Sequence, residues 1–336
     1  MPESPHPGRD LAERLRAGEQ IVAPGVFDPL GARVVQHLGF NTVYLGGYAT
    51  GSHLAITEPL LTMTDQVAAA RRVVSAIDLP LIVDGNAGFG EPLHTMRTVR
   101  EFEAAGVAAI HIEDQAFPKR AHYHKGVEEV CSRREFLVKL EQAIAARSDE
   151  DFLIIARTDA AKAVNGDWEE AAWRCNAALD VGADAVMPLI SEAAARSAGM
   201  TGWQLLDAIR SQVRDEGAIT VLGGSVLGLE DLPLSEYQTK GFQIILYALP
   251  AVMAAAGAIA SLYRPLIERG QLNDRGVTGF AGLEVDGFRE VREMVEDVLD
   301  LPRYYEIEAD VARRLEQDPS ASAARRRSEE PGASDN

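Results

Sequence analysis

Short apolar segments alternate with longer amphipathic segments along most of this 336-residue chain. Several amphipathic segments end in glycine just before the next apolar run, as at Gly39, Gly106 and Gly182, which is typical of a left-handed cap at a helix C-terminus. Uninterrupted apolar runs are typical of parallel strands that helices cover. The predicted strands lie within residues 20–25, 41–47, 80–85, 108–114, 151–159, 183–189, 218–224 and 242–246.

Eight consecutive β/α units predict an α/β fold, a (β/α)8 TIM-type barrel of the usual ~250-residue span with extra C-terminal helices. A doubly wound sheet is the alternative, but such a sheet does not usually need eight consecutive units. The segment GFGEP at 88–92 follows a predicted strand but lacks the Gly-x-Gly-x-x-Gly spacing of a dinucleotide site.

We expect three parts along the chain: a barrel catalytic domain at 1–275, a C-terminal helical extension at 276–317 and a disordered tail at 318–336. The extension reads as charged helices, and the tail has few large apolar side chains.

One apolar segment, 242–263, is almost free of charge and long enough to suggest a transmembrane helix. Pro250 divides it, and its second half is mostly alanine. We expect a buried strand, a short loop and an Ala-rich core helix there, and no membrane association.

Composition narrows the class of protein. The net charge of −18 argues against a nucleic-acid binder, because phosphate neutralisation needs clustered Lys and Arg. Only Cys131 and Cys175 occur, without CxxC spacing, so we expect no disulfide framework and a cytoplasmic location. The first 20 residues have no apolar core, so we expect no signal peptide there.

Polar residues gather where the predicted strands end, which is where catalytic groups lie in such barrels. Carboxylates that meet at one rim repel each other, so a cation or protons must compensate. A hard divalent ion with oxygen ligands, Mg²⁺ or Mn²⁺, is the economical solution. For any single acid the alternative is a helix cap or an ion pair with Arg157. The candidate site residues at or after the ends of the predicted strands are Tyr44, Gly46, Gly47, Glu58, Asp84, Asn86, Glu113, Asp114, Arg157 and Asp159.

Four segments resemble the isocitrate lyase/phosphoenolpyruvate mutase superfamily: GVFDPLGARVVQHLGFNTVYLGG, LPLIVDGNAGFG, AGVAAIHIEDQAFPKR and IIARTDA. Their order and spacing match, and the resemblance covers roughly residues 10–270. It implies a (β/α)8 barrel and a homotetramer of dimers that exchange their last barrel helix. It also implies Mg²⁺ (or Mn²⁺) that binds a 2-oxo or 2-hydroxy acid.

The resemblance also implies roles for individual acids. Asp84 resembles the acid that ligates the metal directly. Asn86 occupies the position of a second Asp that holds metal-bound water. Glu113 resembles the acid that orients another such water, and Glu58 aligns with a further water-holding Asp.

The remaining implied roles concern the substrate and the loop that closes over it. Arg157 resembles the residue that grips the substrate carboxylate, which suits the bidentate geometry of guanidinium. Tyr44, Gly46 and Gly47 resemble the segment that meets the same carboxylate. Lys119 matches the lysine of the gating loop.

Several positions depart from the family pattern. Leu45 replaces the usual Ser, and Asn86 removes a negative charge, which should weaken or retune metal binding. The catalytic cysteine of the lyase branch is replaced by Ala121, and Cys131 lies too far along to substitute. These changes argue against ordinary isocitrate or methylisocitrate cleavage. The Asn-Ser signature of the mutase branch is absent too, which argues against phosphonate chemistry.

The histidine pair around Tyr123 is the candidate replacement for that cysteine. His122, Tyr123 or His124 could deliver a proton to a departing carbanion, because imidazole titrates near neutral pH and loop closure could bring it in. The alternatives are a solvated loop, or a Zn²⁺ site formed by both histidines and an acid, although i, i+2 spacing on a loop is a weak signal for one.

The sequence therefore favours a metal-dependent carbon–carbon lyase or decarboxylase acting on a small 2-oxo/2-hydroxy di- or tricarboxylic acid. It would resemble 2-methylisocitrate lyase or oxaloacetate decarboxylase. Metal and Arg157 would stabilise an enolate-type negative charge. The alternatives are a P–C bond enzyme, similar to phosphonopyruvate hydrolase or phosphoenolpyruvate mutase, and a non-catalytic metabolite-binding relative. The candidate catalytic residues are Lys119, His122, Tyr123, His124 and Glu113.

Overall fold

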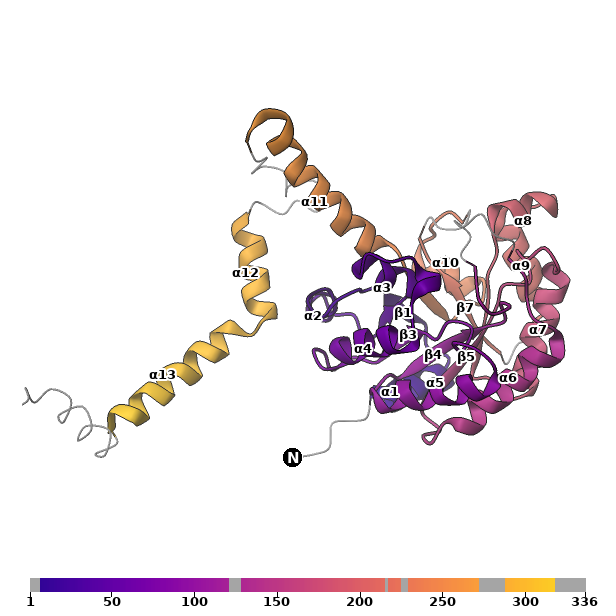
Figure 1. The fold of residues 1–336 in the computed structure, drawn as a ribbon, viewed down its shortest axis with the longest axis horizontal. Coiled ribbons are helices and arrows are strands. Elements are labelled where there is room, and N and C mark those ends of the chain that lie inside the picture. Colours follow the sequence, from indigo (N-terminus) through magenta and orange to yellow (C-terminus); the bar gives the residue numbers. More distant parts are fainter. Residues whose placement is uncertain (1–6, 121–127, 215–216, 225–228, 272–287, 318–336) are drawn as a thin grey trace, which may run out of the picture. The chain divides into compact units, whose positions relative to one another are not determined.

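The computed structural model describes residues 7–120, 128–214, 217–224, 229–271 and 288–317. The chain divides into two compact units, 1–259 and 260–336. In the first unit, strands and helices alternate in the predicted order (Figure 1).

Eight parallel strands form one sheet in which β2 to β8 pair in chain order and β1 pairs with β8. An isolated bridge between Gly25 and Tyr44 brings β1 next to β2, and the amide of Val26 donates to the carbonyl of Tyr44 at 2.8 Å. The sheet is therefore a nearly closed barrel, and the predicted (β/α)8 fold is confirmed. The strands are β1 (Ile21–Pro24), β2 (Val43–Leu45), β3 (Leu81–Asp84), β4 (Ala109–Glu113), β5 (Leu153–Thr158), β6 (Ala185–Pro188), β7 (Ala218–Leu222) and β8 (Ile244–Tyr247).

Helices in the first unit begin and end where the sequence supplies caps. Asp28 accepts a hydrogen bond from the amide of Gly31, and Thr62 forms a capping box with Asp65. The helices are α1 (Pro7–Arg16), α2 (Pro29–His37), α3 (Gly47–His53), η1 (Glu58–Leu60), α4 (Met63–Val74), α5 (Pro92–Ala104), α6 (Arg133–Ala146), α7 (Trp168–Asp180), α8 (Glu192–Ser197), α9 (Gly202–Gln212) and α10 (Leu234–Thr239).

The predicted glycine caps are confirmed. Gly39, Gly106 and Gly182 have φ angles of 87°, 80° and 100°, a region that glycine adopts without steric cost. Each follows a helix directly and reverses the chain toward the next strand.

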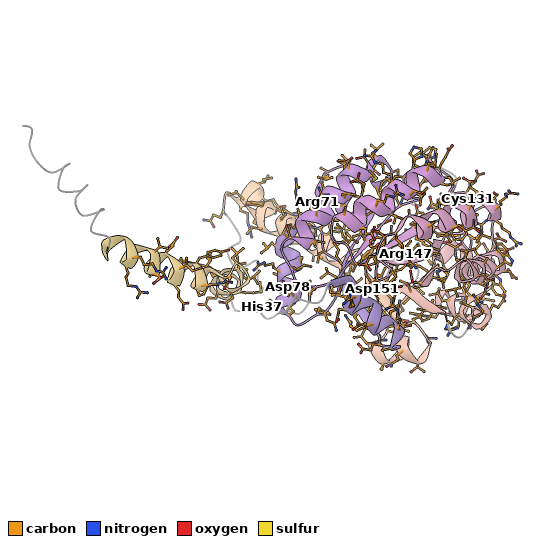
Figure 2. The ribbon with its side chains drawn as sticks, turned by 90° about the horizontal axis from the view of Figure 1, so that it is seen from below. His37, Arg71, Asp78, Cys131, Arg147 and Asp151 are labelled. Carbon is orange, nitrogen blue, oxygen red and sulfur yellow. The ribbon has the colours of Figure 1, made fainter. Side chains whose placement is uncertain are left out.

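Strand alternation divides the core into two layers. One cluster of buried side chains packs between the sheet and the helices, and a second fills the barrel interior together with Leu11 and Leu15 of α1. Helix α1 is further held by Asp151 (Figure 2), which precedes β5. Asp151 pairs with Arg9 and Arg16 of α1 at 3.2 and 3.0 Å. Because α1 closes the interior at the strands' N-terminal ends, the opposite end is left for polar side chains.

Helix α11 (Pro250–Arg269) corrects one prediction. Strand β8 and a short loop precede it as expected, but the helix is not a buried core helix, because Pro265 is its one buried residue. Within the described residues it is the one helix whose length and apolar character would suit a bilayer, and 6% of its most apolar window is buried. Such a helix alone is weak evidence for a membrane span.

The second unit contains the charged helices predicted after residue 275, α12 (Phe288–Val298) and α13 (Leu301–Gln317). The predicted domain limits at 275/276 and 317/318 stay predictions, because 272–287 and 318–336 lie outside the described residues. Both cysteines are buried free thiols, as expected for a chain without a disulfide framework.

Candidate active site

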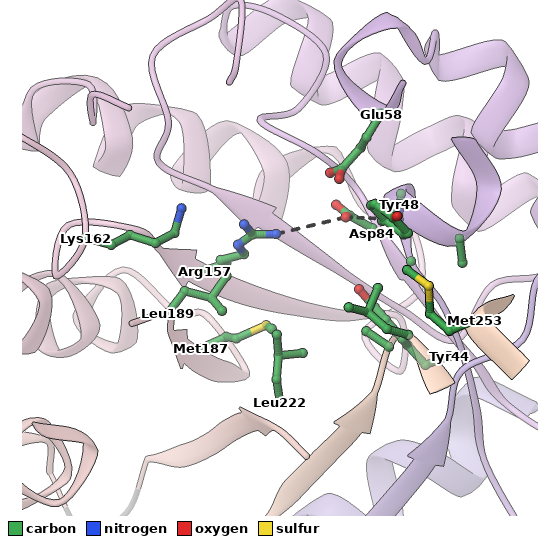
Figure 3. Close-up of a pocket in the computed structure, with 15 residues that line it drawn as sticks. Tyr44, Tyr48, Glu58, Asp84, Arg157, Lys162, Met187, Leu189, Leu222 and Met253 are labelled. Atoms are coloured by element: carbon green, nitrogen blue, oxygen red, sulfur yellow. Dashed lines mark hydrogen bonds and ion pairs between the residues drawn. The ribbon is translucent and has the colours of Figure 1, made fainter. Parts of the chain in front are cut away.

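A cavity of about 480 Å³ lies at the C-terminal ends of the strands (Figure 3). It has the size usual for sites that bind small molecules. Six of the predicted site residues line it: Tyr44, Gly46, Gly47, Glu58, Asp84 and Arg157. The other lining residues are Tyr48, Ala49, Lys162, Met187, Leu189, Leu222, Ala248, Leu249 and Met253.

Period-2 alternation along three adjacent strands brings the predicted acids and the arginine together. Asp84 ends β3, Glu113 ends β4, and Arg157 lies beside Glu113 in the strand register. The Arg157 guanidinium reaches Glu113 Oε2 at 2.9 Å and Asp84 Oδ2 at 4.0 Å. Its other edge binds both carboxylate oxygens of Asp159, at 2.9 and 3.0 Å. Arg157 is thus held rigidly at the pocket wall.

Lys119 connects two of the predicted acids. Its ammonium lies 2.6 Å from Glu58 Oε1 and 3.0 Å from Glu113 Oε1, and the residue is 4% exposed. Burial alone would lower the pKa of Lys119, but Glu113, Glu58 and Asp84 raise it well above its usual value. Lys119 is therefore a fixed cation between the acids.

Asp84 is an ionised carboxylate at neutral pH. Burial alone would raise its pKa, but the basic groups around it, His111 first and then Lys119 and Arg157, hold the pKa far below the usual range. Its Oδ1 accepts from the amide of Asn86 at 2.8 Å and its Oδ2 from the amide of Gly47 at 3.2 Å. An ionised, oriented carboxylate is what a hard metal ion needs as a direct ligand.

Space for an ion is kept open at Gly47. A β-carbon there would lie 3.0 Å from Asp84 Oδ2 and 3.1 Å from Glu58 Oε1. The two oxygens of Glu113 are buried without a hydrogen bond, although two cations lie within ion-pair distance. Within the described ranges no three His, Cys, Asp or Glu side chains form a preformed cluster. These residues fit a hydrated Mg²⁺ or Mn²⁺ with few direct protein ligands better than an all-protein cage.

Asn86, two residues after Asp84, has a left-handed backbone conformation with a φ angle of 56°. Asparagine tolerates this conformation better than most residues do. Its side-chain oxygen accepts from the amide of Ala87 at 2.8 Å, and its carbonyl accepts from the amide of Glu113 at 3.0 Å. Asn86 thereby links the ends of β3 and β4.

Sequence reasoning missed His111, which lies on the same interior face as Glu113. Its Nε2 is 2.8 Å from the Tyr44 hydroxyl, and its Nδ1 is 3.7 Å from Asp84 Oδ1. Burial lowers the pKa of His111, so a neutral imidazole hydrogen-bonds the Tyr44 hydroxyl, and its Nδ1 lies near Asp84 without a hydrogen bond. The alternation in AIHIED could have revealed it, because His111 is two residues before Glu113.

Asp114 and Asp159 form a buried layer behind the pocket rather than part of its wall. Asp114 accepts from the amide of Asp159 at 2.8 Å, from the Thr158 hydroxyl at 2.6 Å and from Arg174 at 3.2 Å. Burial, reinforced by the nearby Asp159 charge, raises the pKa of Asp114 to about 6. Asp114 is therefore better interpreted as a structural acid than as a member of the metal site.

Asp114 should make stability depend on pH. Because its folded-state pKa is raised from 3.8 to about 6, its stabilising contribution is present below pH ~4 and is lost as the pH rises through ~6. The asparagine of Asp114→Asn cannot titrate. When the pH is raised from 4.5 to 7.5, the difference in the free energy of unfolding between the variant and the original chain should therefore change by about 2 kcal/mol in favour of the variant. Urea unfolding at both pH values measures this. A difference that stays constant with pH would contradict it.

The predicted histidine pair cannot be placed. Ala121, His122, Tyr123 and His124 fall in 121–127, outside the described residues. The residues that follow are described: Glu128 pairs with Lys162 at 2.7 Å, so the loop's downstream end is tied to the pocket wall. Sequence reasoning also missed Lys162 and the apolar residues on the β6 and β7 side of the pocket.

Comparisons with known proteins agree with this arrangement. A family model described as phosphoenolpyruvate phosphomutase matches residues 11–266. The chain is 36% identical over 258 residues to 2,3-dimethylmalate lyase of Eubacterium barkeri, covering 76% of this chain and 84% of that protein. It is 31% identical over 270 residues to 2-methylisocitrate lyase of Aeropyrum pernix, covering 80% and 82%.

Among solved structures, oxaloacetate acetylhydrolase in complex with the inhibitor 3,3-difluorooxalacetate matches with a TM-score of 0.76 and 26% identity. The match covers 92% of this chain and 98% of that chain. The chain belongs to the phosphoenolpyruvate phosphomutase family, within the isocitrate lyase/phosphoenolpyruvate mutase superfamily that its motifs resemble.

Proposed function

We propose that this chain is a Mg²⁺- or Mn²⁺-dependent carbon–carbon lyase or decarboxylase acting on a small 2-oxo or 2-hydroxy carboxylic acid. The observation that carries the proposal is the joint position of Asp84, Glu113, Arg157 and Lys119 at one rim of the barrel, beside the cavity. The named relatives support it, because each acts on, or binds as inhibitor, a carboxylic acid of this kind.

In this proposal Asp84 ligates the metal, and Glu58, Asn86 and Glu113 orient water around it. The ion would supply Lewis-acid stabilisation of the oxygen on which negative charge develops. Arg157 would hold the substrate carboxylate, since its guanidinium is fixed by Asp159 and needs no reorganisation when the acid binds.

Tyr44, Gly46 and Gly47 would meet the same carboxylate from the β2 side of the cavity. Lys119 would keep the acids neutralised, and a proton donor from His122, Tyr123 or His124 would complete the site. Because family analogy does not fix the substrate, both a dicarboxylic and a tricarboxylic acid belong to the proposal.

Turnover of a substrate panel tests the proposal. Oxaloacetate, 2-alkylmalates and 2-methylisocitrate are incubated with the protein, with Mg²⁺ or Mn²⁺ and after chelation, and the cleavage products are measured. We expect metal-dependent cleavage of at least one acid. Absence of turnover for every acid would overturn the assignment as a lyase or decarboxylase.

Phosphonopyruvate in the same panel tests the second candidate, a P–C bond enzyme, which the description of the matching family favours. Release of phosphate from phosphonopyruvate, or its conversion to phosphoenolpyruvate, without cleavage of the other acids would support that candidate. Metal-dependent binding of oxalate without any turnover would instead indicate a non-catalytic metabolite-binding relative.

We also propose a cytoplasmic homotetramer built from dimers that exchange α11. Within this chain α11 exposes large apolar side chains, among them Met253, Ile259 and Ile267, and such a surface is usually covered by a partner. Light scattering after size exclusion tests this, and a monomeric mass at micromolar concentration would contradict it.

A further inference from the structure

The turn after β3, residues 84–90, begins with Asp84, which faces the cavity (Figure 3). Its backbone is strained, because Asn86 and Phe89 have φ angles of 56° and 54°, and residues other than glycine adopt this region at a steric cost. Such a turn keeps its shape only where the surrounding structure fixes it. The groups that fix this turn therefore also fix the place of Asp84.

The carbonyl groups in the middle of this turn each accept a hydrogen bond, as buried carbonyls usually do. The donors come from the turn itself and from β4, α5 and α6, so the turn is tied to several neighbouring elements. The pairs are the Gly85 carbonyl with the Gly88 amide at 3.1 Å, Asn86 with the Glu113 amide at 3.0 Å, Ala87 with the Lys139 ammonium at 3.0 Å and Gly88 with the Thr98 hydroxyl at 3.1 Å.

Lys139 is the charged donor among them, and it lies in the protein interior. It belongs to α6 and is 1% exposed. Within the described residues no carboxylate lies within ion-pair distance of its ammonium, whereas Lys119 and Lys162 beside the cavity each pair with two. An ammonium buried without a carboxylate is unfavourable, and an apolar side chain of similar length would avoid that cost. The charge-assisted hydrogen bond to Ala87 is therefore the contact that accounts for a lysine here.

The Ala87 carbonyl lies where steric constraints on the turn are weakest. It belongs to the peptide that joins Ala87 to Gly88, and glycine adopts positive and negative φ angles about equally well. Ala87 is held from one side by Asn86 Oδ1, which accepts from its amide at 2.8 Å, and from the other side by Lys139. Freeing the carbonyl therefore loosens Asn86 as well, whose own amide donates to Asp84 Oδ1 at 2.8 Å.

We propose that Lys139 is a positioning residue for the metal site. Its ammonium fixes the peptide between Ala87 and Gly88, and through it the orientation of Asn86 and Asp84 toward the ion. Lys139 is not among the residues that line the cavity, so it acts through the turn and not by touching metal or substrate. This inference rests on the proposed function, because it assumes that Asp84 holds the ion.

The charge of Lys139 and its positioning role have opposite effects on Mg²⁺ binding. A nearby positive charge repels the ion, so its removal alone would tighten Mg²⁺ binding. Loss of the contact that holds the turn would weaken it. For Lys139→Met we expect the Kd for Mg²⁺, titrated calorimetrically at fixed oxalate, to rise about 10- to 100-fold, the range for outer-sphere partners of metal ligands.

Two further variants separate positioning from a general loss of stability. Lys139→Arg returns the charge and the donors, so it should recover most of the Mg²⁺ affinity. Leu140 is fully buried on the same helix, and Leu140→Ala leaves a cavity in the packing. It should lower the melting temperature and leave the Kd for Mg²⁺ unchanged. Circular dichroism checks that each variant is folded, and Lys139→Gln, which also lacks the charge, replaces Lys139→Met if that variant is not.

Hydrogen exchange in chelator adds a readout that needs neither metal nor turnover. Amides of the turn, residues 84–90, should exchange faster in Lys139→Met than in the original chain or in Leu140→Ala, because a freed turn opens locally. Mass spectrometry of peptides that contain the turn measures this difference.

The outcomes separate this inference from the proposed function. A Kd for Mg²⁺ that is unchanged or lower in the folded variant lacking the Lys139 charge, or that rises equally in Leu140→Ala, refutes the positioning role and leaves the proposed function standing. Unchanged exchange of the turn refutes it too. If the original chain does not bind oxalate in Mg²⁺, the proposed function and the positioning role are both overturned.

Discussion

Replacing Arg157 with methionine should weaken oxalate binding in Mg²⁺ about 100- to 1000-fold and lower kcat/KM for any substrate at least as much, the range found when one preorganised charge-stabilising donor is removed. The guanidinium lines the cavity and is held by Asp159 on its far edge. A methionine fills similar space but offers no donors. Calorimetric titration measures the loss.

The same change should also reduce stability, because Arg157 lies between the buried carboxylates of Glu113 and Asp159. Leaving buried acids without their partner costs about 3–5 kcal/mol. Arg157→Lys keeps the charge but loses the two-pronged geometry, so it should recover most of the stability and little of the binding. Arg97→Met, on the exposed face of α5, is the matched control. Equal oxalate affinity in Arg157→Met and Arg97→Met would rule out a carboxylate-binding role for Arg157.

Replacing Asp84 with asparagine should raise the apparent Kd for Mg²⁺ by more than about 100-fold, since even outer-sphere partners of metal ligands contribute 10- to 100-fold. The change removes the ionised oxygen beside Gly47 while keeping the side chain's shape. Titrating Mg²⁺ at fixed oxalate and following the melting temperature measures the shift.

Asp78→Asn provides the control for that experiment. Asp78 is an exposed acid just before the N-terminal end of β3, whereas Asp84 ends the same strand. The identical chemical change there should leave Mg²⁺ dependence unaltered. If Asp84→Asn also binds Mg²⁺ with unchanged affinity, Asp84 is not a metal ligand.

The barrel could be predicted from the sequence because each strand lies in a mostly apolar run, and β3 and β4 end at the acids Asp84 and Glu113. The run 80–85 predicts β3 to within one residue at either end, and 108–114 does the same for β4. Once the strands are known, the parallel sheet alone requires that Asp84, Glu113 and Arg157 meet at one rim.

Other parts of the site could not be predicted, for distinct physical reasons. His111 is inside an apolar run, so its polarity was hidden by its neighbours, and only strand alternation places it under the rim. Asp114 is next to Glu113 in sequence but points to the opposite face of the strand, where Arg174 of α7 meets it.

Helix α11 shows the limit of composition as a guide to burial. Alanine-rich, uncharged sequence is equally suited to a core helix and to a helix that packs on another chain, because both need a small apolar surface. Within this chain the helix remains largely exposed, so the prediction of a buried core helix was wrong.

The most direct test of the central claim, a divalent ion held at Asp84 that binds the acid with Arg157, is the titration of oxalate with and without Mg²⁺. We predict measurable oxalate binding only when Mg²⁺ is present, and tighter Mg²⁺ binding in the presence of oxalate by the same factor, since linkage between two ligands is reciprocal. Equal oxalate affinity in Mg²⁺ and in chelator would contradict the account.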